Sequence, residues 1–488
     1  MRSISRLRDE TALALIVLLG LALRVLGVGR ESLWFDEAMT VTMARDSFGA
    51  VLDHVAAQES HPPLYFWLVW AWMELFGGAE LPARSLSVVC GTLAIVPAHF
   101  IARRIFDRRV ANLAALLVAT APILVYYSQE ARPYAVFLLL CLATVALFVK
   151  AVQCGQAFAW WSLVACAALA TLTHYYMAFT LLALGGFALF FRRRYPLSLR
   201  RILAGLGVYA LLVVPWFTSD AFASQMRLSL FPHHPLAQKA AGDPLTFLRI
   251  MNVFDHGSIP WRFAYAPIWT FLVGGLILAL PASLALLRLF ARGSERRERD
   301  GIALVALLWL LPVALVLALG FRGIKVEVRY IAFAAVPYYV LVALGVLRLP
   351  ALGRALGIAA LLAWSAVGLH RTYTTPSRED WRGALGALVR ELRAGDAVLF
   401  DPFGEPPLEW AIYHPDSPPL PLVDLDEATR GIPCDRLWVL SYARVLVEDE
   451  AADRAREAVA ARFEKVSEER FFLVTLALHV PRQGERQR

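Results

Sequence analysis

Long apolar segments alternate with short polar ones over the first 370 residues of the chain. An α-helix needs about 20 apolar residues to cross the hydrocarbon core of a bilayer. With 58% hydrophobic and 18% charged residues and a mean hydropathy of +0.55, the composition excludes a soluble protein of this length. About 11 transmembrane helices are predicted, at roughly 11–28, 84–102, 110–127, 133–150, 157–173, 175–191, 202–218, 266–290, 302–320, 329–347 and 355–370.

The apolar segment from Pro63 to Phe76 differs from these spans. As a helix it would be only about 20 Å long, against a hydrocarbon core of about 30 Å. It also contains Glu74 and three tryptophans, so we predict that it lies at the membrane interface. The positive-inside rule favours this choice, because basic clusters at 103–109 and 192–201 then fall on the cytoplasmic side together with the basic N-terminus.

The formal net charge of +8 fits the same orientation signal. A nucleic-acid partner is not expected, because no basic patch is interleaved with base-stacking aromatic residues. The five cysteines have no C-x-x-C spacing and predict neither a zinc site nor a disulfide framework. The N-terminal segment has no small-residue cleavage site after its apolar run, so we expect a retained first helix rather than a signal peptide.

From Arg371 onward the composition becomes that of a soluble domain. Ser377 and Asp380 form a capping-box pattern at the start of a helix. Alternating strands and helices predict a small α/β domain. Strands are expected at 396–401, 436–442 and 471–479, and helices near 407–413 and 448–463. The predicted organisation is a transmembrane domain at 1–370, with a first outer loop at 29–83, and an extracytoplasmic α/β domain at 371–488.

An acidic pair, Asp36 and Glu37, lies in the polar loop that follows the first apolar segment. Trp34 and Phe35 beside it are residues typical of the bilayer surface, where a falling dielectric can shift the pKa of a carboxyl group. Asp36 is therefore a candidate catalytic base. The alternative is structural, since aspartate is a favoured N-cap and Glu37 would complement the dipole of a helix beginning there.

Other ionisable residues collect on the same predicted outer face. Cations around an opening at the membrane surface suit an anionic head group whose apolar tail stays in lipid. Each cation could instead extend its charged end to the interface, and the acid could simply pair with a neighbouring arginine. The cations are Arg132, His174, Lys325 and Arg329, and the acid is Glu130.

Four motifs, in the order in which they occur along the chain, resemble those of the GT-C superfamily of integral-membrane glycosyltransferases. The likeness is to bacterial relatives of dolichyl-phosphate-mannose protein mannosyltransferases and of the lipid A aminoarabinose transferase, and it covers about residues 10–350. It implies the GT-C fold and a sugar donor linked to polyprenyl phosphate. The motifs are Leu33–Ala38 with the acidic pair, His61–Trp67, Arg84 with Ala102–Phe106, and Tyr127–Tyr134.

The resemblance also implies roles for single residues. Asp36 matches the catalytic acid of the family's first loop and Glu37 its acidic neighbour, while Glu130 lies close to where the family has a second acid. His174 takes the place of a lysine that contacts the lipid phosphate, and Arg329 with Tyr330 matches a late Arg-Tyr pair.

The chain departs from the family at residues 59–61. Relatives often have lysine where His61 stands, and some have an acidic metal ligand immediately before it, where this chain has Ser60. Glu59 is one place away. A divalent metal ion is therefore possible, but no ligand set can be assigned.

The sequence thus predicts a multi-pass enzyme of the bacterial cytoplasmic (inner) membrane. It would be a hexosyl- or pentosyltransferase of the cell envelope, mannosyltransferase-like, with its active site and C-terminal domain outside the cytoplasm. Asp36 would act as base in an inverting transfer to an unknown acceptor, a glycan, lipid or protein, and His61, Arg132, His174, Lys325, Arg329 and Tyr330 would bind the donor. The alternative is a transporter or flippase of a lipid-linked sugar, whose ionisable residues would be expected near the bilayer midplane.

Overall fold

The computed structural model describes residues 2–195, 197–230, 268–291, 295–322, 328–401, 407–430, 432, 434–442 and 450–482. The chain forms two compact units. The first, the helical unit, contains Met1–Val28 and Met43–Thr375. The second, the sheet unit, contains Gly29–Thr42 together with Pro376–Arg488.

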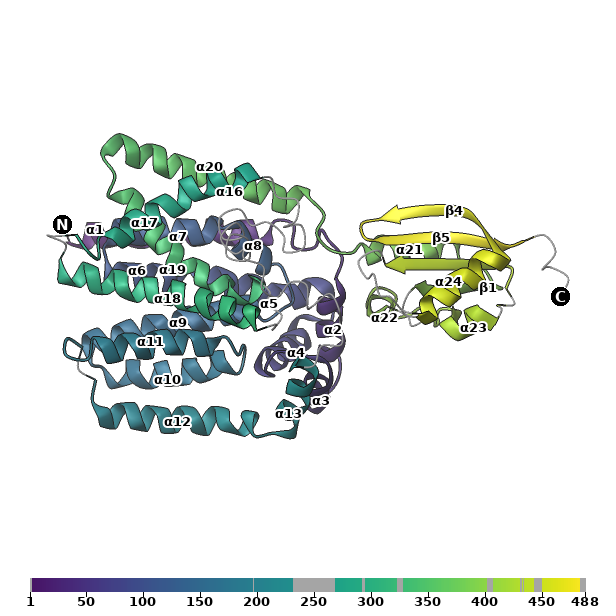
Figure 1. Cartoon of the computed structure of the whole chain (residues 1–488), viewed down its shortest axis with the longest axis horizontal. Coiled ribbons are helices and arrows are strands. Elements are labelled where there is room, and N and C mark those ends of the chain that lie inside the picture. The colour runs from purple at the N-terminus through teal and green to yellow at the C-terminus, as the bar shows by residue number, and fades with distance from the viewer. Residues whose placement is uncertain are drawn as a thin grey trace. The chain divides into compact units, whose positions relative to one another are not determined.

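The helical unit is a bundle of long and short helices (Figure 1). Its described elements are α1 (Arg2–Val25), α3 (Phe48–Gln58), α4 (Leu64–Phe76), α5 (Glu80–Leu93), α6 (Ile95–Ile105), α7 (Arg108–Thr120), α8 (Pro122–Tyr127), α9 (Tyr134–Cys154), α10 (Ala157–Thr171), α11 (Met177–Phe190), α12 (Leu199–Phe217), α13 (Asp220–Leu230), α16 (Ile268–Gly274), the π-helix η2 (Gly275–Ala279), α17 (Leu280–Leu287), α18 (Arg296–Phe321), the 3-10 helix η3 (Val328–Ala334), α19 (Ala335–Leu347) and α20 (Ala351–Thr374). Helix α2 (Phe35–Ala44) begins in the sheet unit and ends in the helical unit.

Six helices of the described chain are long and apolar enough to cross a membrane, so the protein is a multi-pass membrane protein. The expected number of about 11 is not confirmed. The segment expected as one span at 110–127 is two helices, because Pro122 has no backbone N–H to continue α7 and instead begins α8. The six are Glu80–Ile105, Tyr134–Cys154, Leu199–Phe217, Arg296–Phe321, Arg329–Leu347 and Ala351–Thr374.

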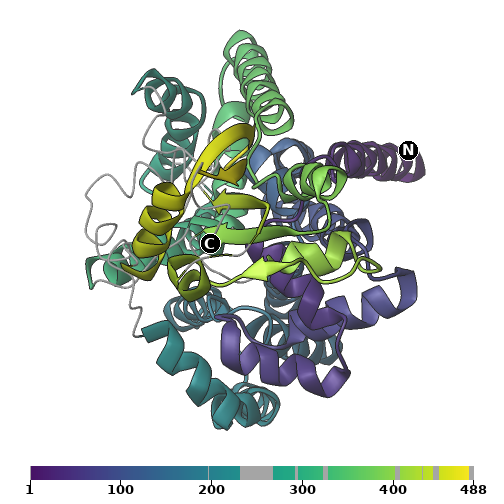
Figure 2. The ribbon, with the colours of Figure 1, turned by 90° about the vertical axis from the view of Figure 1, so that its right-hand side faces the viewer.

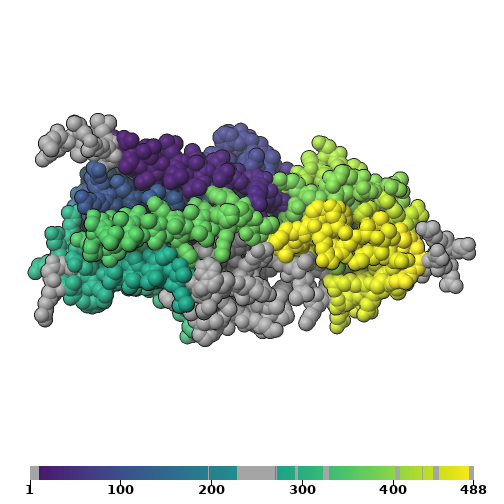
Figure 3. Space-filling model, turned by 90° about the horizontal axis from the view of Figure 1, so that it is seen from above, coloured from purple at the N-terminus to yellow at the C-terminus, as the bar shows by residue number. Residues whose placement is uncertain are grey.

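The core of the helical unit lies where α9 and α19 pack among their neighbours. Figure 2 views the molecule from the right-hand side of Figure 1, and Figure 3 shows α1 and α20 at the surface. Helices α17 and α19 approach so closely that a Cβ atom on Gly345 would lie 1.9 Å from the carbonyl oxygen of Pro281. Only glycine allows this approach.

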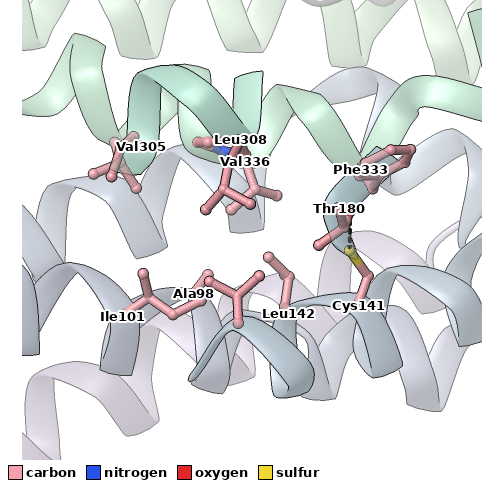
Figure 4. A pocket seen from close by; sticks show the side chains of 12 residues that line it. Ala98, Ile101, Cys141, Leu142, Thr180, Val305, Leu308, Phe333 and Val336 are labelled. Atoms are coloured by element: carbon pink, nitrogen blue, oxygen red, sulfur yellow. Dashed lines mark hydrogen bonds between the residues drawn. The ribbon is translucent and has the colours of Figure 1, made fainter. Parts of the chain in front are cut away.

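A small cavity of about 30 Å³ remains in this core (Figure 4). Its lining is apolar apart from Cys141 and Thr180, whose Sγ and Oγ1 atoms lie 3.3 Å apart and bond to each other. A space of this size could hold a water molecule, but a buried water needs two to four polar partners. The two polar groups already satisfy each other, so we expect the cavity to be dry.

Arg24 is a fully buried cation near the end of α1. Its guanidinium donates to the Ser128 hydroxyl and to the carbonyls of Gly20, Val118 and Ala119. The side chain of Gln129 donates to the carbonyls of Leu23, Arg24 and Leu26 at the C-terminal end of the same helix. These bonds satisfy helix-end carbonyls that would otherwise lack donors, and they fix the turn that leads to Glu130.

The sheet unit has a five-stranded mixed sheet in the order β2-β1-β3-β5-β4, with β1 parallel to β2 and β3 and the other pairs antiparallel. Strand β1 shows the period of two: Val398 and Phe400 contribute to one core, Ala397 and Leu399 to the other. The first core includes α21 and the second α24, so helices cover both faces. The described elements after α2 are α21 (Trp381–Glu391), β1 (Asp396–Asp401), α22 (Leu408–Tyr413), β2 (Leu422–Val423), α23 (Leu425–Arg430), β3 (Arg436–Tyr442), α24 (Glu450–Arg462), β4 (Phe463–Phe471) and β5 (Val474–Pro481).

Two local expectations were wrong. Helix α21 is capped by Asp380, whose carboxylate accepts from the Gly383 backbone N–H, while the Ser377 side chain bonds to Glu31 instead. Asp36 is not the N-cap of α2, because the helix begins at Phe35 and Asp36 lies inside its first turn. The expected structural role of Asp36 as a cap therefore does not account for its presence.

Candidate active site

A buried ion pair joins two of the motifs in the helical unit. Glu59 receives two hydrogen bonds from Arg132, Nη1 to Oε1 at 2.5 Å and Nη2 to Oε2 at 3.2 Å. His61 Nδ1 lies 3.2 Å from the same Oε2. All three side chains are at most 4% exposed. This two-bond geometry is the strongest form of an arginine–carboxylate contact and fixes the orientation of the guanidinium.

Helix ends place these side chains. Glu59 is the C-cap of α3, and Pro63 precedes the first residue of α4, so the segment between the two helices has little freedom. Gln225 Nε2 donates to the His61 carbonyl at 2.8 Å, which holds this segment from α13. Arg132 comes directly before Pro133, the N-cap of α9.

His174 lies between α10 and α11 in a group of aromatic rings. Its ring centroid is 5.0 Å from that of His61, 5.5 Å from Tyr330 and 4.8 Å from the stacked ring of Phe137. Nδ1 accepts from the Tyr176 backbone N–H, so the neutral ring carries its proton on Nε2. That buried Nε2 has no hydrogen-bond partner among the described residues. It is a donor available to a ligand.

The structure brings most of the expected donor-binding residues of this unit together. Tyr330 is within 6.2 Å of Tyr134, His61 and His174, measured between ring centroids. Arg329 lies over the ring of Tyr330, 5.6 Å from its centroid. Lys325 lies outside the described residues.

Burial and nearby charges determine the protonation of the cluster. Burial by itself would raise the pKa of Glu59, but Arg132 and His61 outweigh it and lower that pKa to about 2. Burial lowers the pKa of His61, with Glu59 opposing and Arg132 and Arg329 reinforcing the effect. Burial, His61 and Arg132 hold the pKa of His174 well below its ordinary value. At neutral pH we therefore take Glu59 as ionised and both histidines as neutral.

The donor set does not fit a metal centre. Both oxygens of Glu59 are already bonded to Arg132, and one also to His61. Within the described ranges no group of three His, Cys, Asp or Glu side chains could hold a metal ion.

Asp36 and Glu37 belong to the sheet unit, whereas Glu130 is buried in the helical unit, in the turn between α8 and α9. Glu37 is fully buried and pairs with Arg378, with Nη1 3.8 Å from Oε2. Asp36 is half-buried, and its backbone carbonyl accepts from the Thr40 hydroxyl at 2.9 Å.

Sequence reasoning missed Glu59 and Arg378 as candidate functional residues. In the sequence, Glu59 stands one position away from the metal ligand of some relatives, which suggests no other role for it. An acid two residues before a histidine in a polar loop could nevertheless have suggested the contact between Glu59 and His61. Arg378 gave no signal, because its partner lies 341 positions earlier in the chain.

The fold is that of known membrane glycosyltransferases. The structure is similar to ArnT from Cupriavidus metallidurans in the apo state, with a TM-score of 0.51, 16% identity, and coverage of 95% of this chain and 97% of that chain. It is also similar to the Archaeoglobus fulgidus oligosaccharyltransferase AglB in complex with an inhibitory peptide and a dolichol-phosphate, with a TM-score of 0.52, 12% identity, and coverage of 98% and 77%. The likeness to the arabinofuranosyltransferase AftD from Mycobacteria has a TM-score of 0.52 and 13% identity, and covers 98% of this chain and 40% of that one.

The chain therefore has the fold of the GT-C superfamily, which confirms the resemblance seen in its motifs. More particularly, residues 60–218 match the family model described as dolichyl-phosphate-mannose-protein mannosyltransferase. No curated protein matches the chain.

Proposed function

We propose that this protein transfers a sugar from a polyprenyl-phosphate donor to an acceptor on the extracytoplasmic face of the membrane, with inversion at the anomeric carbon. The observation that carries the proposal is the cluster formed by the buried side chains of Arg132, His61 and His174 with the half-buried Arg329. It combines the oriented guanidinium of Arg132 with the Nε2–H donor of His174, which lies among aromatic rings and has no hydrogen-bond partner in the described part of the chain. A lipid phosphate is the kind of ligand that such donors stabilise.

The leaving group in this reaction is the lipid phosphate, which needs its developing charge stabilised. Arg132 and Arg329 would supply positive charge, and His174 Nε2–H would donate a hydrogen bond. Burial strengthens these interactions, because the local dielectric is far below that of water. The dolichol-phosphate bound to AglB supports a ligand of this class.

The Asp36 carboxylate would take the proton of the acceptor as it attacks the anomeric carbon. The new bond forms on the face opposite to the leaving phosphate, which departs with the bonding electron pair, so the configuration inverts. General-base assistance of this type contributes about 10²- to 10⁴-fold in rate. Glu37 or Glu130 would orient the acceptor.

A transporter or flippase of a lipid-linked sugar is the second candidate. It would place its ionisable residues on broken helices near the bilayer midplane. The cluster instead lies at helix ends: Glu59 after α3, Arg132 before α9, His174 between α10 and α11, and Arg329 in η3 before α19. This placement favours chemistry at the membrane surface.

The test is a transfer assay with the full chain in lipid nanodiscs and a panel of polyprenyl-phosphate sugars. Release of polyprenyl phosphate from one donor, lost by at least about 10²-fold in Asp36→Asn, is the expected result. Asp53→Asn, an exposed acid on α3, is the matched control and should keep full activity. If Asp36→Asn keeps full activity, the proposed mechanism is wrong. If the wild-type protein releases no polyprenyl phosphate but moves the donor across the membrane of sealed vesicles, the protein is a flippase and not a transferase.

A further inference from the structure

The sheet unit holds the segment Gly29–Thr42 by contacts from residues more than 300 positions later. Arg382 donates to the carbonyls of Gly29 and Glu31, each at 3.2 Å. Ser377 donates to Glu31 through both its backbone N–H and its hydroxyl. The acidic segment thus folds as part of the C-terminal domain, although the sequence places it in the first outer loop.

Two further bonds hold the residues just before α2. The Leu33 backbone N–H donates to the Tyr413 hydroxyl at 2.6 Å, and the Ser32 hydroxyl donates to the Glu379 carbonyl. Leu33 itself is fully buried. These contacts fix the entry into α2, whose first turn contains the acidic pair.

The ion pair of Arg378 with Glu37 fixes that turn itself. Both side chains are at most 5% exposed, so removing either would take this ion pair away from the buried charge that remains. Successive residues of a helix are about 100° apart around its axis. Holding Glu37 in the interior therefore sets the direction of Asp36, which is half-buried on the neighbouring side.

Arg378 lies before α21, in a domain that buries other acids as well. Glu379 and Glu409 are also buried in the same domain, and Glu379 accepts a hydrogen bond from the Tyr442 hydroxyl. Replacing Arg378, which lies in the segment before α21 and in no strand, would disturb the acidic segment more than the sheet.

We infer that the C-terminal domain positions the catalytic acids, with Arg378 as the positioning residue that holds Glu37 and thereby orients Asp36. This inference rests on the proposed role of Asp36. It gives the domain a part in the sugar-transfer step itself, beyond covering the site or presenting an acceptor. Arg378 would not touch the substrate.

The test compares Arg378→Met and Arg378→Lys with Arg390→Met, an exposed arginine in the last turn of α21. Hydrogen–deuterium exchange of the full chain in nanodiscs is measured on peptides covering 29–42 and on β1 and β3. In Arg378→Met, exchange should rise in 29–42 and stay unchanged in the two strands, which shows that the domain is folded. Arg390→Met should match wild type, and Arg378→Lys should fall between, because lysine keeps the charge but not the planar geometry.

Turnover is measured on the same samples. Misplacing a catalytic group by about 1 Å can cost about 10²-fold, so kcat of Arg378→Met should fall by about that factor while KM for the donor stays within twofold. Unchanged exchange in 29–42 would show that Arg378 does not hold this segment. Raised exchange with unchanged kcat would overturn the positioning role. Full activity of Asp36→Asn would instead refute the proposed function and leave the exchange result intact.

Discussion

Replacing Glu59 gives the sharpest test of the cluster in the helical unit. In Glu59→Ala the guanidinium of Arg132, only 4% exposed, loses its carboxylate partner and both of its hydrogen bonds to it. Removing one member of a buried ion pair typically costs about 3–5 kcal/mol, because the remaining charge stays buried without compensation. His61 also loses the acceptor for Nδ1.

A second ion pair supplies the comparison. Asp300 is buried and pairs with Arg194, whose side chain is 50% exposed. In Asp300→Ala the arginine can be rehydrated, so we expect a cost of only about 1–2 kcal/mol from the lost hydrogen bonds. The unfolding free energy of both variants is measured in the same detergent by denaturant titration.

The double variant Glu59→Ala with Arg132→Met separates pairing from burial. If the single costs come from an unpaired charge, the double variant should be less destabilised than the sum of the two singles by about 1–3 kcal/mol. Costs of Glu59→Ala equal to those of Asp300→Ala, together with additive effects in the double variant, would refute a buried, coupled pair.

Three further predictions concern other parts of the chain. Arg24→Ala should lower the unfolding free energy by about 2–5 kcal/mol, because it removes a buried side chain and four hydrogen bonds. Gly345→Ala should cost about 1–3 kcal/mol in the same assay, since its Cβ would clash with the Pro281 carbonyl. Burial raises the pKa of Glu409 from 4.5 to about 8, so the folded state keeps a proton that the unfolded state releases between those pH values. Stability should therefore fall by up to about 1.4 kcal/mol per pH unit in that window, and Glu409→Gln, compared with wild type by thermal unfolding, should lose this part of the slope.

Hydrophobic patterning could predict elements but not their partners. Apolar runs located α9 and α20 to within a few residues, and the strands β1 and β3 were expected at their observed bounds. Strand β4 was not expected, because its sequence Phe463–Phe471 is mostly charged and exposed, as suits the edge of a sheet.

The candidate site was predictable in part for the same reason. Residues His61, Arg132 and His174 could be proposed from their places at helix ends, and the structure brings them together. The pairing of Arg132 with Glu59 could not be predicted, because a carboxylate 73 positions from an arginine gives no local signal of pairing.

The protonation of the cluster has a consequence for ligand binding. At rest, Arg132 is balanced by Glu59, and burial keeps His61 and His174 neutral, so little net charge has to be buried. A phosphate entering beside the rings would reverse the balance, because a nearby anion favours the charged form of a histidine. By linkage, a pKa that rises on binding requires proton uptake.

Titration calorimetry with polyprenyl phosphate in buffers of different ionisation enthalpy should therefore show uptake of protons near pH 7, reduced in His174→Phe. Binding heats that do not depend on the buffer would show that both histidines stay neutral and that Arg132 and Arg329 alone carry the charge of the site.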